Sequence, residues 1–327
     1  MDTYPISSNS LEKFFHINGD RLGQQYKDSL SDYPTWDQKE HADKWLIFPG
    51  NIGPRLSIDE TSLSNGELYT ILTNKEAKGK KGAIVAMVEG TTAESIINVI
   101  ASVPQKERAK VSEITLDMAG SMNLVAKKCF PNAEQVIDRF HVQKLAFDAL
   151  QEIRIAHRWE AINEETNEIE NCKADNRRYE PKILKNGETK KQLLFRSRYL
   201  LFKAPNYWTL TQKKRAKILF KLYPDIKQAF SLVHSLRCIY NQKHPKNVAI
   251  AKLALWFNKV TEAEFKSFNT ISATMYAHYD KILNYFNNRS TNASAESFNA
   301  KIKAFRSTQR GVRDVNFFLF RLTKIYA

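Results

Sequence analysis

The sequence predicts an α/β fold: a mixed five-stranded sheet flanked by helices, with an all-α insertion before the last helices. Three strand-like runs follow one another closely between residues 55 and 88. Two more, at 112–118 and 135–138, alternate with helical patterns. From 188 to 287 the spacing of apolar residues is helical, with almost no strand signal. A meander followed by alternating strands and helices is typical of a mixed sheet with helices on both faces.

The composition favours a folded protein with a polyanionic partner. The chain has 327 residues, 43% of them hydrophobic, which allows a sizeable core, and a formal net charge of +15. Such a basic balance points to nucleic acid, with a merely cationic soluble protein as the alternative. Three scattered cysteines form no CxxC pair, so neither a zinc ribbon nor a disulfide framework is indicated. No secretory signal or membrane span is visible, and we expect a cytoplasmic protein.

The chain divides into four stretches by pattern. Residues 1–48 predict a helical leader whose Trp36 and Trp45 pack on the main domain, and 49–166 the first part of the core. Residues 167–287 predict a polar, mobile loop up to about 186 and then a helical insertion, and 288–327 the helices that complete the core. The elements expected in the core are strands at 55–61, 67–73, 83–88, 112–118 and 135–138 and helices near 91–103, 119–130, 140–165 and 315–326.

Local signals mark several element ends. Ser64-Asn65-Gly66 predicts a hairpin turn, and Thr91 to Glu94 has the spacing of a capping box. In the insertion, Thr209 predicts a helix cap and Pro224 the start of the next helix. Two further helices are expected at about 247–260 and 262–286.

Acidic residues stand where strands should enter the core. Asp59 lies in the first strand, Asp117 near the end of the fourth, and Glu296 early in a basic helix. An isolated acid of this kind usually marks a solvated strand end, but a buried carboxylate needs a partner or a cation. Spacings of 58 and 179 residues are weak evidence by themselves, and the strand, strand and helix placement is more specific.

Three carboxylates so placed predict phosphoryl transfer. Two Mg²⁺ or Mn²⁺ ions about 3.5–4 Å apart can activate the attacking oxygen and stabilise the leaving oxygen of a phosphodiester. A cationic row follows Glu296 and would neutralise flanking phosphates; it comprises Lys301, Lys303, Arg306, Arg310 and Arg313.

Several motifs together resemble the DDE insertion-sequence transposases of the bacterial ISL-three group. They are Ser57–Ser62, Leu116–Met118, Asp138–Val142, Ala295–Lys303, and a stretch from Arg310 through Phe317 to Leu322. The resemblance spans residue 45 to the C-terminus. It implies a ribonuclease-H-like core, a catalytic and metal-binding triad of Asp59, Asp117 and Glu296, and a helical insertion before the glutamate. It also implies that Asp138, His141 and Asn299 lie near the site, although His141 could equally be a helix-start histidine bonded to backbone.

The resemblance also sets expectations about partners. Family members usually begin with a zinc-binding segment and a helix-turn-helix that bind transposon ends. This sequence has neither the cysteines nor the length for them, so we expect a separately encoded DNA-binding partner or a remnant. The resemblance implies a homodimer on double-stranded DNA, associated with the nucleoid in a bacterial cytoplasm. Insertions at this place in other DDE transposases contact end DNA, so Trp208 could stack on a base, while packing of the insertion is the alternative.

Three functions remain open. The leading one is a transposase catalytic subunit that cuts transposon ends and joins them to target DNA. A ribonuclease-H-like nuclease or resolvase would share the acids and cut without joining. A domesticated, non-catalytic DNA-binding protein would need no intact acidic trio.

Overall fold

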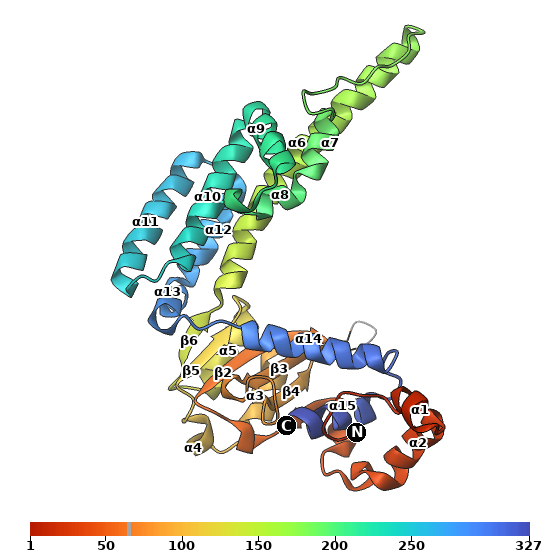
Figure 1. The fold of residues 1–327 in the computed structure, drawn as a ribbon. Helices are drawn as coiled ribbons and strands as arrows, with labels where there is room; N and C mark the ends of the chain where they lie inside the picture. The colour runs from red at the N-terminus through yellow and green to blue at the C-terminus, as the bar shows by residue number, and fades with distance from the viewer. Residues whose placement is uncertain (64–66) are drawn as a thin grey trace. The chain divides into compact units, whose positions relative to one another are not determined.

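The computed structural model describes residues 1–63 and 67–327. The chain forms two compact units, Met1–Asp138 with Asn288–Ala327, and Arg139–Asn287 (Figure 1). We call them the core unit and the helical unit and describe each by itself. The predicted Ser64-Asn65-Gly66 turn lies outside the described residues. No helix in the described ranges has the length and apolar character needed to cross a bilayer.

The core unit is built on a mixed sheet, as the sequence predicts. Within the described residues the sheet has six strands rather than five, in the order β1-β4-β3-β2-β5-β6. The additional strand, β1, lies inside the predicted helical leader and pairs with β4. The sequence does not predict it, because a strand of three residues is too short to show a period. The strands are β1 (Trp45–Ile47), β2 (Arg55–Ser62), β3 (Leu68–Asn74), β4 (Ile84–Glu89), β5 (Glu113–Leu116) and β6 (Glu134–Ile137).

The first and fourth predicted strands are neighbours. β2 pairs with β5 in parallel, with Ser57 opposite Thr115, and β5 pairs in parallel with β6, with Leu116 opposite Ile137. The meander β2-β3-β4 is antiparallel. The sheet therefore combines an antiparallel half with a parallel half, and β2 lies at the junction.

Helices cover both faces of the sheet. Five successive residues of β4, from Ile84 to Val88, are buried, which requires packing partners on both sides. One core cluster joins Ile71 and Met87 of the sheet to Phe298 and Leu322 of α14 (Ala293–Thr308) and α15 (Val315–Tyr326). The helix predicted at 315–326 is thus part of the core. Since Asp59 pairs with Ile71, α14 and α15 lie on the face that carries Asp59.

The remaining helices of the core unit fill the other face and the N-terminal region. α3 (Ala93–Ala101) contacts β4 and β1, and α5 (Gly120–Cys129) contacts β5 and α3. The capping box predicted at Thr91–Glu94 is wrong, because the N-cap of α3 is Thr92 rather than Thr91 and makes no side-chain cap bond. The N-terminal region holds α1 (Asn9–Phe15), α2 (Gly19–Gln25), a π-helix at Tyr26–Leu30 and 3₁₀ turns at Tyr33–Thr35, Lys39–His41 and Pro49–Asn51, and α4 (Gln105–Arg108) precedes β5.

The helical unit is organised around the long helix α6 (Arg139–Ala174). Its other helices are α7 (Lys190–Arg196), α8 (Arg198–Phe202), α9 (Leu210–Leu222), α10 (Pro224–Asn241), α11 (Lys246–Ala263), α12 (Lys266–Ala277) and α13 (Tyr279–Asn288). The capping box at Thr209 is confirmed, with Gln212 as its second member. The single helix expected at 262–286 is wrong, since α12 ends at Ala277 and α13 begins at Tyr279.

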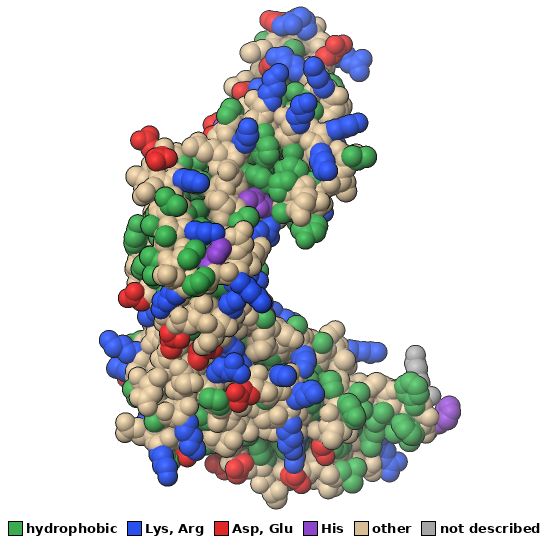
Figure 2. All heavy atoms as spheres, turned by 60° about the vertical axis from the view of Figure 1, so that its left-hand side comes forward, with side chains coloured by type: hydrophobic (Ala, Val, Ile, Leu, Met, Phe, Trp, Pro, Cys, Tyr) green, Lys and Arg blue, Asp and Glu red, His purple; other side chains and the backbone are tan. Residues whose placement is uncertain are grey.

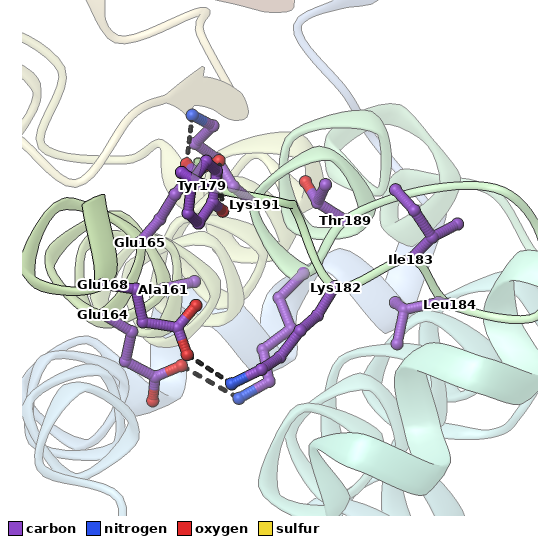
Figure 3. A pocket seen from close by; sticks show the side chains of 11 residues that line it. Ala161, Glu164, Glu165, Glu168, Tyr179, Lys182, Ile183, Leu184, Thr189 and Lys191 are labelled. Atoms are coloured by element: carbon purple, nitrogen blue, oxygen red, sulfur yellow. Dashed lines mark hydrogen bonds and ion pairs between the residues drawn. The ribbon is translucent and has the colours of Figure 1, made fainter. Parts of the chain in front are cut away.

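The predicted loop at 166–186 is wrong at its start, because α6 continues to Ala174. Ile169 is the one large aliphatic residue in this part of the helix, so the segment shows no hydrophobic period. Ion pairs with the returning chain hold it instead: Lys182 with Glu168, Lys190 with Glu164 at 2.9 Å, and Lys191 with Glu165 (Figure 3). These groups line a pocket of the helical unit that contains none of the predicted catalytic acids.

Candidate active site

The predicted aspartates lie along one edge of the parallel half of the sheet, where β5 and β6 end. Asp59 and Asp117 lie two residues beyond the paired Ser57 and Thr115, so both belong to the same face. Asp138 follows the Leu116–Ile137 pair directly, and its amide donates to the Leu116 carbonyl at 3.0 Å. Asp59, Asp117 and Asp138 therefore lie at the same level along three adjacent strands.

Helix α14 lies over this edge and bonds to it at two places. Asn292, at the N-cap, donates from Nδ2 to the Ile58 carbonyl at 3.2 Å. Asn299 donates from Nδ2 to Asp59 Oδ2 at 2.8 Å and to the Glu60 carbonyl at 3.2 Å. Glu296 lies between them in the first turn, and its amide donates to the Asn292 carbonyl at 2.9 Å. Positions 292, 296 and 299 share one helix face, so two amides bracket Glu296.

The acidic side chains of this edge interact with backbone amides and, between Glu60 and Asp117, with each other. The Asp59 Oδ1 atom accepts from the Glu60 amide at 2.9 Å, and Asp117 Oδ1 accepts from the Ala119 amide at 2.7 Å. Burial, and secondly the negative charge of Asp117, raise the pKa of Glu60 above its usual value. The Glu60 carboxyl therefore lies within electrostatic reach of Asp117, and a cation near this edge would relieve the repulsion.

A buried ion pair lies behind the acids on the same face of β5. Lys75 Nζ donates to Thr115 Oγ1 at 2.8 Å and to Glu113 Oε1 at 3.3 Å. The Lys75 ammonium also bonds Ser290, three residues before the first residue of α14. Sequence reasoning missed this pair because Lys75 and Glu113 are 38 residues apart and neither belongs to a motif. The only available signal was an acid at the start of an apolar strand.

The predicted cationic row begins on α14 and continues beyond its last residue, Thr308, at Arg310 and Arg313. Lys301 donates to the Gly79 carbonyl at 2.7 Å, and Arg306 donates to the Leu63 carbonyl at 2.8 Å, so both tie the helix to loops of the core unit. Lys303, Arg310 and Arg313 are exposed. DNA binding by these side chains stays a prediction.

Two predicted site residues belong to the helical unit. Trp208 packs there: its indole Nε1 donates to the Leu200 carbonyl at 3.0 Å, and its ring lies 5.5 Å from that of Phe230. This favours packing over stacking on a base, whereas the neighbouring Tyr207 is exposed. His141 lies in the first turn of α6, and its role near the acids stays a prediction.

Residues of the edge fit a hydrated divalent cation. Within residues 1–63 and 67–327, no three Asp, Glu, His or Cys side chains converge closely enough to cage an ion. Mg²⁺ needs no such cage, because it keeps several waters and takes one or two carboxylates plus substrate phosphates. Buried oxygens without a hydrogen-bond partner flank Asp59: Ser57 Oγ, Thr61 Oγ1 and Asn292 Oδ1. Buried oxygen atoms without a protein hydrogen-bond partner suit contact with bound water and with a hard cation.

A mixed sheet with β2 beside β5, an aspartate inside β2 level with one directly after β5, and a later acid-bearing helix define a ribonuclease-H-like fold. A family model described as a transposase, that of the DDE transposases of the ISL-three group, matches residues 56–322. The match spans most of the chain, so the protein belongs to this transposase family. No curated protein matches it. The family is one of enzymes that cut and join DNA.

Proposed function

We propose that the protein cuts transposon-end DNA and joins it to target DNA through a triad of Asp59, Asp117 and Glu296. The observation that carries this proposal is the placement of these acids: two at the same level of adjacent parallel strands, and one in the first turn of a helix whose Asn292 and Asn299 bond to β2. The family match supports the same reaction class.

The three carboxylates would hold two divalent cations, Mg²⁺ or Mn²⁺. When bound, such ions supply activation of the attacking oxygen and stabilisation of the leaving oxygen. Asn299 keeps one oxygen of Asp59 engaged at 2.8 Å, which fixes the orientation of the carboxylate. Lys303 lies on the same helix, Arg310 lies two residues beyond its end, and both are exposed, so they are available to flanking phosphates.

The charge distribution supports a DNA substrate that also reaches the helical unit. Residues 139–287 hold 27 Lys and Arg against 14 Asp and Glu, a net +13, whereas the core unit holds 23 against 21, a net +2. Figure 2 shows Lys and Arg side chains spread over the helical unit on the face drawn there. Exposed examples between α7 and α9 are Arg198, Lys203, Lys213, Lys214, Lys217 and Lys221. Non-specific affinity for DNA should therefore come chiefly from this unit.

A plasmid assay separates this proposal from the two alternatives. Supercoiled DNA bearing candidate ends is incubated with the protein and Mg²⁺ or Mn²⁺, with a chelator as control. Metal-dependent cleavage followed by strand-transfer products is the expected outcome. Cleavage without joining would instead identify a nuclease or resolvase, and DNA binding with no cleavage in either metal a domesticated binding protein.

A further inference from the structure

The chain segment that leads into α14 is held by a buried polar cluster. Glu113, at the start of β5, is 4% exposed in its side chain, and its ion-pair partner Lys75 is 14% exposed. Asn288 donates from Nδ2 to Glu113 Oε2 at 3.3 Å. The Ser290 hydroxyl donates to Glu113 Oε1 and accepts from the Lys75 ammonium. We call Lys75, Glu113, Asn288 and Ser290 the entry clamp.

The residue between the two clamped positions has an uncommon backbone conformation. Arg289 has a φ of 54°, in the left-handed region that residues other than glycine rarely adopt. Such a conformation persists only when its surroundings hold it. Here the flanking Asn288 and Ser290 are both bonded to Glu113, so the clamp fixes the turn from both sides.

The clamp acts as a charged pair. Burial lowers the pKa of Lys75, and the charge of Glu113 opposes this effect. Burial would raise the pKa of Glu113, but the hydroxyl of Ser290 and the charge of Lys75 outweigh it, and the pKa lies below its usual value. A charged acceptor binds the Ser290 and Asn288 donors more strongly than a neutral one.

We propose that Lys75 and Glu113 are positioning residues, which set where α14 begins and thereby hold Glu296 toward the acids of β2 and β5. This inference rests on the proposed function. The geometry is direct: the last clamped residue, Ser290, precedes the first helical residue, Ala293, by three positions, and Glu296 follows three positions later. A buried ion pair is weak evidence for stability, since apolar residues of similar size can replace it. Apolar residues could not hold two polar side chains of the entering segment.

The experiment compares the double variant Lys75→Met/Glu113→Leu with a matched control, Lys110→Met/Glu107→Leu, which removes an exposed ion pair of the same unit. Three quantities are measured: the unfolding temperature, amide hydrogen exchange over 293–299, and the Mn²⁺ concentration that half-saturates DNA cleavage. The single variant Lys75→Met, which leaves a buried charge unpaired, is expected to unfold at a lower temperature. The double variant avoids that penalty.

For the double variant we expect a near wild-type unfolding temperature, exchange over 293–299 at least tenfold faster, and a half-saturating Mn²⁺ concentration at least fivefold higher. DNA affinity and the control variant should match wild type. Wild-type exchange and Mn²⁺ dependence in the double variant would overturn the inference. A wild-type protein that cuts no DNA in either metal would overturn the proposed function, and exchange over 293–299 would still decide whether the clamp orders this turn.

Discussion

Asn299→Asp replaces an amide with a carboxylate of the same shape, directly beside Asp59. The wild-type amide donates to Asp59 Oδ2 at 2.8 Å and to the Glu60 carbonyl at 3.2 Å, and the substitution removes both donors. Two unit charges about 4 Å apart repel by about 4 kcal/mol at an effective dielectric of about 20. Since the edge is partly solvated, we expect the free energy of unfolding at neutral pH to fall by about 2–4 kcal/mol without metal.

The assay is urea unfolding with and without Mn²⁺, and Asn132→Asp, an exposed site in the same unit, serves as the control. An ion held by Asp59 would screen the new repulsion, so Mn²⁺ should restore about half or more of the lost stability. Its stabilising effect should therefore be larger in Asn299→Asp than in wild type or control. An equal effect of Mn²⁺ on all three proteins would refute metal binding at Asp59.

Three further predictions concern residues outside the triad. Lys303→Gln should reduce the salt slope of log K for binding to any duplex by roughly 0.9. Lys301→Gln should instead lower the free energy of unfolding by about 1 kcal/mol, since Lys301 bonds a backbone carbonyl. Binding titrations and urea unfolding check the two variants, and equal salt slopes would contradict the prediction. Trp208→Ala should lower the unfolding temperature by several degrees and leave DNA affinity and cleavage in the cold unchanged, so slowed cleavage in a stable variant would revive stacking on a base. Burial lowers the pKa of His157, but hydrogen bonds to Asp225 and Glu160 outweigh this effect and raise the pKa above 6.5. The stabilising effect of His157 should therefore be full below pH 6.5 and fade as the pH rises through the raised pKa. Urea unfolding of His157→Gln from pH 5 to 9 checks this, and a difference in stability from wild type that stays constant with pH would refute it.

Much of the fold could be predicted from the sequence because the core elements repeat their apolar residues with clear periods. Strands β2 to β6 and helix α15 follow the predicted ranges closely. Two failures, β1 and the end of α6, occurred where no hydrophobic period exists. β1 has only three residues, and the end of α6 is polar and held by ion pairs with residues 14–26 positions away. Long-range ion pairs of this kind leave no local pattern.

The candidate site was only partly predictable. Motifs predict Asp59, Asp117, Glu296 and Asn299 as site residues, and the structure brings their strands and helix together. Lys75 and the other members of the entry clamp were missed, since their association depends on tertiary contacts between three separate segments. Conversely, Trp208 was singled out for its neighbouring cations, and its hydrogen bond to a backbone carbonyl shows a packing role that composition cannot reveal.

The most direct measurement of the central claim is metal-dependent cleavage of end-bearing DNA by Asp59→Ala, Asp117→Ala and Glu296→Ala. Glu94→Ala, an exposed acid on α3, serves as the matched control. Each triad substitution should abolish cleavage in both Mg²⁺ and Mn²⁺ and leave DNA affinity and folding close to wild type, because each removes a carboxylate from a shared two-ion site. Near-normal turnover in any one of the three variants would remove that residue from the triad and contradict the proposed mechanism.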